Sequence, residues 1–250
     1  MKKLLLILLC LPFIGFGQQT YVPDDNFEQV LINLGYDNIL DDSVLTASID
    51  TLILLNVESQ NISDLTGIED FSLLEHLECQ GNSITSLDLS TNVALTTLYC
   101  NSNNLTSLDL SQNIALTALY CGQNKQLTSL DVSYNSALTH LACQSGPFTS
   151  LDVSQNTALF YLNCENNQLT SLDLSNNINL WLLTCGNSQL QCLNIANGNN
   201  VNLSDCYISF SPLLYCIEAD DSVYMNNNWQ QHFNPIDSQY YFSNNCSNFC

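Results

Sequence analysis

The residues best suited to chemistry in this chain are cysteines, and six of them recur at a nearly constant interval. They are Cys79, Cys100, Cys121, Cys143, Cys164 and Cys185, with gaps of 21, 21, 22, 21 and 21 residues. Zinc needs ligands that converge on one point, and redox chemistry needs exposed thiols with a low pKa. Each cysteine instead takes a place where an apolar side chain points inward. Side chains that stack in register aim the same way, which strains a disulfide between neighbours. We therefore expect a buried, reduced column of thiols.

A second regular row consists of carboxylates, which we call the aspartate ladder. Five repeats carry a Leu-Asp-Leu or Leu-Asp-Val core, and its members are Asp88, Asp109, Asp131, Asp152 and Asp173. Stacked about 4.8 Å apart, neighbouring charges repel by roughly 0.9 kcal/mol per pair even in water. Hydroxyl groups of flanking serines, raised carboxylate pKa values or bound cations can each offset this repulsion. We predict weak, site-sharing calcium binding along the ladder, although no calcium-loop spacing is present. We expect no other metal or cofactor.

The remaining chemical groups do not form a catalytic pattern. His76 and His140 are three repeats apart, roughly 14 Å in a stack, and His232 lies beyond the repeats. A phosphate-binding loop, a zinc signature and a nucleophile elbow are all missing from the sequence. A row of equivalent, solvated carboxylates does not create the separated pKa values that acid–base catalysis needs. The sequence therefore predicts a protein that is not an enzyme.

The elements that position these rows are short strands. Residues 75–198 hold six repeats of 21–22 residues, and each repeat has two similar halves of about ten residues. Leu98-Tyr-Cys100-Asn-Ser-Asn103 represents the first half and Leu108-Asp-Leu110-Ser-Gln-Asn113 the second. Apolar and polar residues alternate in both halves, which indicates half-buried strands joined by asparagine turns. A fixed period of this length is typical of a solenoid, here a mainly β repeat protein with two short parallel sheets.

The regions on either side of the repeats have different compositions. Residues 1–17 have a basic start and an apolar stretch, which indicates a signal peptide rather than a transmembrane segment. Residues 18–74 contain an expected helix that begins at Asp25-Asn-Phe-Glu28, buries Phe27, Val30, Leu31 and Leu34, and stops at Gly35. With an initial repeat, this helix forms an N-terminal cap. Residues 199–250 lose the period and are expected to form a C-terminal cap.

The charge of the chain excludes some partners. Residues 18–250 hold one basic residue, Lys125, and 24 acidic residues, a formal charge of 1 − 24 = −23. Such a surface repels phosphate backbones and anionic lipids, so nucleic acid is not expected as a partner.

The repeats resemble the bacterial leucine-rich repeats with nested half-repeats, known as the IRREKO type. The resemblance covers residues 52–198 and rests on the alternating Leu-x-x-Leu-x-Leu-x-x-Asn and Leu-x-x-Leu-Asp-Leu halves. Ile62-Ser-Asp-Leu-Thr-Gly-Ile68 and Leu214-Tyr-Cys216-Ile217 also resemble segments of secreted bacterial proteins of this class. The resemblance implies a right-handed solenoid without catalytic residues, and it implies a Cys216–Cys246 disulfide in the C-terminal cap.

Other features of the cysteines and the turns depart from the repeat pattern. By loop position we expect a second disulfide between Cys192 and Cys206. Residues 18–250 contain 11 cysteines, so at least one stays unpaired, with Cys250 as the candidate. The additional residue Lys125 predicts a local bulge in one turn. Gly146-Pro147-Phe148 replaces the usual Asn-x-Leu, so the asparagine contact of that repeat should be lost.

The two outward faces of the expected solenoid differ in variety. The second-half face repeats Ser-x-Asp-x-Ser, whereas the first-half face changes from repeat to repeat. Recognition of a shaped partner needs variety and rigid aromatic side chains. We therefore predict a binding site for a protein or glycan at His76, Glu78, Tyr99, Asn101, Tyr120, His140, Tyr161 and Asn163. Ordinary exposed strand residues, with Tyr99 and Tyr120 packed on each other, are the competing interpretation.

Taken together, the sequence predicts a monomeric, secreted or cell-surface protein, with the periplasm as a further possible location. The alternative function is a passive spacer in the cell envelope.

Overall fold

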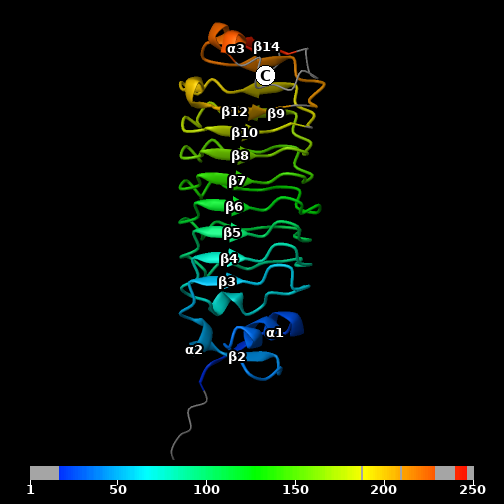
Figure 1. Cartoon of the computed structure of the whole chain (residues 1–250), viewed down its shortest axis with the longest axis vertical. Coiled ribbons are helices and arrows are strands. Elements are labelled where there is room, and N and C mark those ends of the chain that lie inside the picture. The colour runs from blue at the N-terminus through cyan, green and yellow to red at the C-terminus, as the bar shows by residue number, and fades with distance from the viewer. Residues whose placement is uncertain (1–16, 187, 209, 229–239, 247–250) are drawn as a thin grey trace, which may run out of the picture.

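The structure is a computed structural model, and it describes residues 17–186, 188–208, 210–228 and 240–246. Short rungs stack along one long axis, with α1 and α2 at the N-terminal end and α3 at the C-terminal end (Figure 1). The expected solenoid is therefore confirmed. All but the last residue of the expected signal peptide lies outside the described residues, and His232 and Cys250 lie outside them as well.

One parallel sheet runs along almost the whole solenoid. It has eight strands in the order β12-β10-β8-β7-β6-β5-β4-β3, each of three residues. The strands are β3 (Leu54–Asn56), β4 (His76–Glu78), β5 (Thr97–Tyr99), β6 (Ala118–Tyr120), β7 (His140–Ala142), β8 (Tyr161–Asn163), β10 (Leu182–Thr184) and β12 (Asp205–Tyr207). The middle residue of each strand is buried, as the alternating pattern predicts. We call the outward side of this sheet and of the turns that flank its strands the varied face.

The second sheet is shorter than the sequence predicts. It contains four strands in the order β14-β13-β11-β9, and these are β9 (Ser171–Asp173), β11 (Cys192–Asn194), β13 (Cys216–Glu218) and β14 (Tyr241–Ser243). The second halves of the earlier repeats bury Leu89, Leu110, Val132 and Val153 but are not strands. Their aspartates accept the backbone N–H two residues ahead, and Asp173 of β9 does the same, so this bond does not explain why the earlier half-repeats are not strands. We call this side the second-half face.

The strands also continue beyond the last regular repeat. β12 pairs with β10, and β13 pairs with β11, so residues after 198 extend both sheets although their sequence has lost the period. The helix α3 (Ser222–Asn228) follows β13, and η2 (Asn200–Asn202) precedes β12.

The N-terminal cap combines helices with a small antiparallel sheet. It contains β1 (Gln19–Tyr21), α1 (Asp25–Asn33), β2 (Ser43–Leu45), α2 (Thr46–Ile49) and η1 (Ile68–Asp70). The helix cap is Asp24, not Asp25, because the Asp24 carboxylate accepts the N–H groups of Asn26 and Phe27. The expected burial of Leu34 is wrong, since this side chain is 49% exposed just before Gly35 ends the helix with a φ of +83°.

The buried Glu28 has a different role from the expected capping residue. Its carboxylate accepts the backbone N–H groups of Asp41, Asp42 and Ser43, so it fixes the loop that leads into β2.

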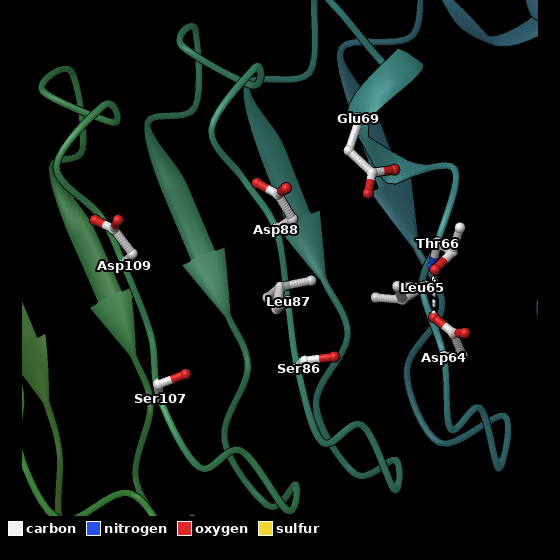
Figure 2. Close-up of a pocket in the computed structure, with 9 residues that line it drawn as sticks. All are labelled: Asp64, Leu65, Thr66, Glu69, Ser86, Leu87, Asp88, Ser107 and Asp109. Atoms are coloured by element: carbon white, nitrogen blue, oxygen red, sulfur yellow. Dashed lines mark hydrogen bonds between the residues drawn. The ribbon is translucent and has the colours of Figure 1, made fainter.

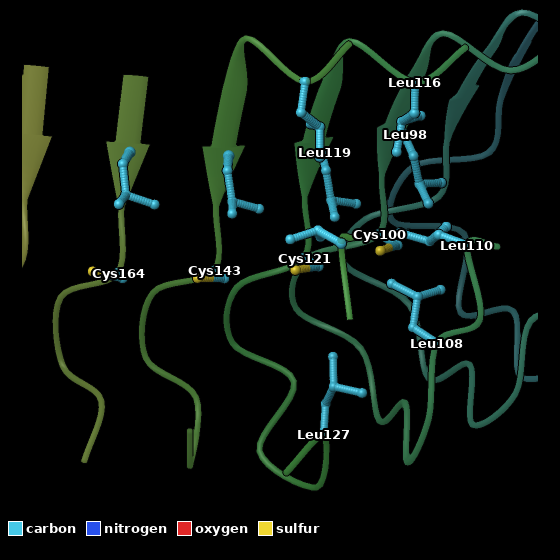
Figure 3. Packing of buried hydrophobic residues seen from close by; sticks show 14 of the residues in the cluster. Leu98, Cys100, Leu108, Leu110, Leu116, Leu119, Cys121, Leu127, Cys143 and Cys164 are labelled. Atoms are coloured by element: carbon cyan, nitrogen blue, oxygen red, sulfur yellow. The ribbon is translucent and has the colours of Figure 1, made fainter. Parts of the chain in front are cut away.

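The thiol column is confirmed as buried and reduced. All six repeat cysteines are free and at most 1% exposed, and the sulfur atoms of Cys100, Cys121, Cys143 and Cys164 lie in a row (Figure 3). Cys206 is a seventh free, buried thiol next to this column. Burial raises the pKa of Cys79 and of Cys143 to about 12, so these thiols stay protonated at neutral pH.

The expected disulfides have different outcomes. Cys216 and Cys246 form the predicted bridge. The Cys192–Cys206 prediction is wrong: Cys192 is disulfide-bonded, but Cys206 is free. Cys192 has the register of the serine column, opposite Ser171. Cys206 is instead the middle residue of β12 in the other sheet, so the loop position was misleading.

Two asparagine rows stabilise the turns. In the first row, Asn103 donates to the carbonyl groups of Cys79 and Cys100 and accepts the N–H of Ile84. Gly146 takes this place in its repeat, and the bond is missing there as predicted: Leu127 N–H turns to the Asn124 backbone carbonyl instead. The additional residue Lys125 lies with Gln126 in an extra turn, as expected.

Candidate functional site

The eight predicted binding residues lie on the varied face. Seven belong to strands β4 to β8, and Asn101 lies two residues after β5. All eight are partly exposed. The register of the parallel strands places Glu78, Tyr99 and Tyr120 in one row, and it places His140 beside Tyr161. The structure thus brings together side chains that the chain separates by about 20 residues each.

Tyr99 and Tyr120 form a stacked pair at the centre of this face. Their ring centroids are 4.4 Å apart and their planes differ by 5°. Partial burial raises the pKa of Tyr120, and the neighbouring Tyr99 adds to this effect. The mutual packing is what the competing interpretation predicts. It also holds both rings in one conformation, while each ring stays partly exposed.

A second aromatic group lies nearer the C-terminal end and includes two residues that the sequence analysis missed. Phe160 and Trp181 stack with ring centroids 5.4 Å apart and planes 3° from parallel. Their side chains are 41% and 40% exposed. His140 is 6.1 Å from the Phe160 ring and 6.0 Å from the Tyr161 ring. The four side chains form a continuous patch over β7, β8 and β10.

A signal for Phe160 and Trp181 was present in the sequence. Both directly precede a strand, in the column that Thr96, Thr117 and Thr139 occupy in earlier repeats. Each of these threonines donates its hydroxyl to a carbonyl of the preceding repeat. Inspecting this column would have shown that aromatic residues replace hydrogen-bonding threonines in two successive repeats.

Polar contacts order the N-terminal part of the varied face. Asn56 donates to the Glu78 carboxylate at 2.6 Å, which joins β3 and β4 through their side chains. Near the middle of the face, Thr139 Oγ1 and His140 Nδ1 are 2.9 Å apart. These bonds restrict the side chains before any ligand arrives.

The aspartate ladder follows the second-half face. Each aspartate accepts the backbone N–H of the serine two residues later, at 2.9–3.0 Å. Hydrogen bonds from the backbone and hydroxyl of these serines hold the pKa of Asp88, Asp109, Asp131 and Asp152 below the ordinary value. Of the three mechanisms that could offset charge repulsion, the serine contacts are therefore present, and the pKa of these four aspartates is lowered and not raised.

A shallow groove opens at the N-terminal end of the second-half face. Its volume is about 340 Å³, and its lining includes Asp64, Glu69, Asp88 and Asp109 (Figure 2). Within the part of the chain that the structure describes, no three His, Cys, Asp or Glu residues are gathered closely enough to hold a metal ion. The calcium hypothesis for the ladder thus remains a prediction.

The histidines on the varied face are separated as expected. His76 is in β4 and His140 in β7, with β5 and β6 between them.

No helix of the described residues is both long and apolar enough to cross a membrane.

Comparisons with known proteins identify the architecture. The chain is 38% identical to internalin J of Listeria monocytogenes over 72 residues, which are 29% of this chain and 8% of that protein. The match therefore spans under a tenth of the relative's length. The crystal structure of internalin C2 from L. monocytogenes superposes with a TM-score of 0.67 at 21% identity, covering 84% of this chain and 93% of that one. The structure of L. monocytogenes InlP gives 0.63 at 22% identity, covering 78% and 60%.

A search of known protein families finds no match to the chain. At these identities the superpositions establish the fold and not the ligand. The stacked parallel strands and the agreement with internalin C2 together show that the chain has the fold of a leucine-rich-repeat solenoid.

Proposed function

We propose that this protein is a non-catalytic, extracellular leucine-rich-repeat protein that binds a protein or glycan partner through the varied face. One observation carries the proposal. Two groups of partly exposed, mutually stacked aromatic residues lie on a single sheet, whereas the second-half face repeats Ser-x-Asp-x-Ser. The similarity to internalins supports a binding role of this kind.

Aromatic residues held in this way are suited to recognition. Tyrosine and tryptophan are enriched among residues that dominate binding energies. Stacking of Phe160 on Trp181 and of Tyr99 on Tyr120 fixes the rings before binding, so little side-chain entropy is lost when a partner packs on them. The short strands beneath them are anchored by buried leucines.

A non-catalytic role agrees with the spacing of the titratable groups. A paired general acid and base must both reach the reacting centre of one substrate, with pKa values that are shifted apart. Two intervening strands separate His76 from His140, which does not favour a shared reacting atom.

The disulfide supports an extracellular or periplasmic location. Structural disulfides persist in oxidising compartments and are rare in the cytosol. The Cys216–Cys246 bridge closes the C-terminal cap, and the apolar N-terminal segment is typical of an exported chain. Because the free thiols are buried, they can stay reduced in an oxidising compartment.

A pull-down from cell-surface extracts with matched variants tests the proposal. The test variant replaces Tyr99, Tyr120 and Tyr161 with alanine, and the control replaces the exposed Ser107, Ser129 and Ser150 with alanine. Circular dichroism checks that both variants fold. We expect a partner that is retained by the native protein and the control but weakened by roughly 30-fold or more with the tyrosine variant. Equal retention by all three proteins would favour the passive spacer.

A further inference from the structure

We infer that the partner of the varied face presents a polypeptide segment rich in lysine and arginine, which runs along the solenoid axis. This inference deepens the proposed function and rests on it. The argument is one of charge complementarity on a face whose strands hold no lysine or arginine.

Carboxylates lie at both ends of the aromatic groups. Glu75 and Glu78 belong to the repeat of β4, before Tyr99 in the stack. Glu165 lies two residues after β8, in the repeat that holds Phe160 and Tyr161, and Asp205 opens β12 beyond Trp181. All four are exposed or partly exposed. Along the axis, carboxylates thus lie before, within and after the run of aromatic side chains.

The strands of the varied face supply no lysine or arginine to neutralise these carboxylates. Lys125 is the single lysine or arginine in residues 18–250, and it lies in the turn after β6 rather than on a strand. Among the described residues of the varied face, the Glu78 carboxylate accepts from a neutral asparagine, which leaves its charge uncompensated.

Aromatic rings and carboxylates recognise the same kind of side chain. A guanidinium or ammonium group is attracted to the face of Trp or Tyr and forms hydrogen-bonded ion pairs with carboxylates. Arginine can do both at once because its planar group stacks and donates in a fork. A basic segment is therefore favoured over a neutral glycan, which would leave the carboxylates without partners of opposite charge.

The distance between the acidic ends sets the length of the segment. Six strand-to-strand steps separate β4 from β12, which is roughly 29 Å at the usual spacing. An extended peptide rises about 3.3 Å per residue, so about nine residues span both ends. A segment of this length can contact the Tyr99–Tyr120 pair and the Phe160–Trp181 pair together.

The aspartate ladder provides an internal control, because it attracts any cation non-specifically. The probe is a fluorescent peptide of about twelve residues with alternating Arg and Ser, and the matched peptide alternates Glu and Ser. The face variant replaces Glu75, Glu78 and Glu165 with Gln. The control removes the same charge from the ladder by replacing Asp109, Asp131 and Asp152 with Asn. Anisotropy titrations at several salt concentrations give Kd.

We expect the face variant to weaken Arg–Ser binding roughly tenfold, since each exposed ion pair contributes about 1.5- to 5-fold. The ladder variant should change Kd less than twofold, and the Glu–Ser peptide should not bind. Equal weakening by both variants would show non-specific attraction and overturn the inference. A partner that needs the tyrosines in the pull-down but binds independently of salt would also overturn it, while leaving the proposed function intact.

Discussion

The two asparagine rows should differ in how much each residue stabilises the fold, although their side chains are chemically identical. Asn103 represents the first row and Asn113 the second, and both are buried. Asn113 donates to the carbonyl groups of Leu89 and Asn92, and Asn103 donates to those of Cys79 and Cys100, with a longer contact to the Asn101 carbonyl. The rows differ in whether the side-chain oxygen accepts a hydrogen bond.

The Asn103 side-chain oxygen accepts the backbone N–H of Ile84 at 3.0 Å. The Asn113 side-chain oxygen is buried without a hydrogen-bond partner among the described residues. After substitution by alanine, all of these carbonyl groups keep another donor: for example, Asn82 still bonds Cys79, and Asn124 still bonds Cys100. The Ile84 N–H alone becomes an unpaired buried group.

An unpaired buried donor costs about 1–3 kcal/mol, and removal of the unpaired Asn113 oxygen relieves a similar penalty. The lost bonds to carbonyl groups and the cavity are comparable in the two variants. We therefore expect Asn103→Ala to lower the free energy of unfolding by about 2–6 kcal/mol more than Asn113→Ala, the sum of the two terms. Urea denaturation followed by circular dichroism measures this difference, with equal m-values as the check on the analysis. Equal losses, or a larger loss for Asn113→Ala, would refute this assignment of hydrogen bonds.

Three further predictions follow from burial and charge. In the folded protein the buried thiols keep their protons, whereas in the unfolded protein they ionise, so the free energy of unfolding should fall as pH rises from about 9 toward about 12. A thiol reagent should modify these cysteines only in denaturant. Burial disfavours the ionised form of Asp24, but hydrogen bonds from Ser63 and the α1 backbone outweigh this effect and hold the pKa of Asp24 below its usual value. Asp24→Ala should therefore lower the free energy of unfolding by about 1–2 kcal/mol above pH 4 and by less in acid. The exposed Asp25→Ala is the near-neutral control in the same urea assay. If the aspartate ladder binds calcium weakly, calcium should raise the melting temperature of the native protein but not of its Asp109→Asn, Asp131→Asn, Asp152→Asn variant; identical melts with calcium and with chelator would reject the hypothesis.

The gap in the first asparagine row illustrates how local sequence and packing are linked. A Cβ at Gly146 would come within 3.0–3.1 Å of the Phe148 ring and of the Asn167 oxygen. The glycine and the large ring therefore accommodate each other. The pattern Gly146-Pro147-Phe148 predicted the lost bond, but the close approach of the Phe148 ring, which a side chain at residue 146 would have to displace, is visible only in three dimensions.

Much of the architecture was determined by the sequence alone. The regular cysteines, leucines and asparagines set the height of each rung and decided which side chains face inward, because a stack of equal units forces equivalent residues into register. The buried thiols, the Cys216–Cys246 bridge and the bulge at Lys125 followed from that period or from the resemblance it revealed.

Tertiary structure alone decided the features that depend on contacts across rungs. The sequence did not show that the second sheet is limited to β9, β11, β13 and β14, that Cys206 enters the first sheet, or that Phe160 stacks on Trp181. Periodicity reports which way a side chain points. Which neighbour it meets depends on where the chain returns after each turn, and beyond the last regular repeat only the packing of the whole solenoid sets that position.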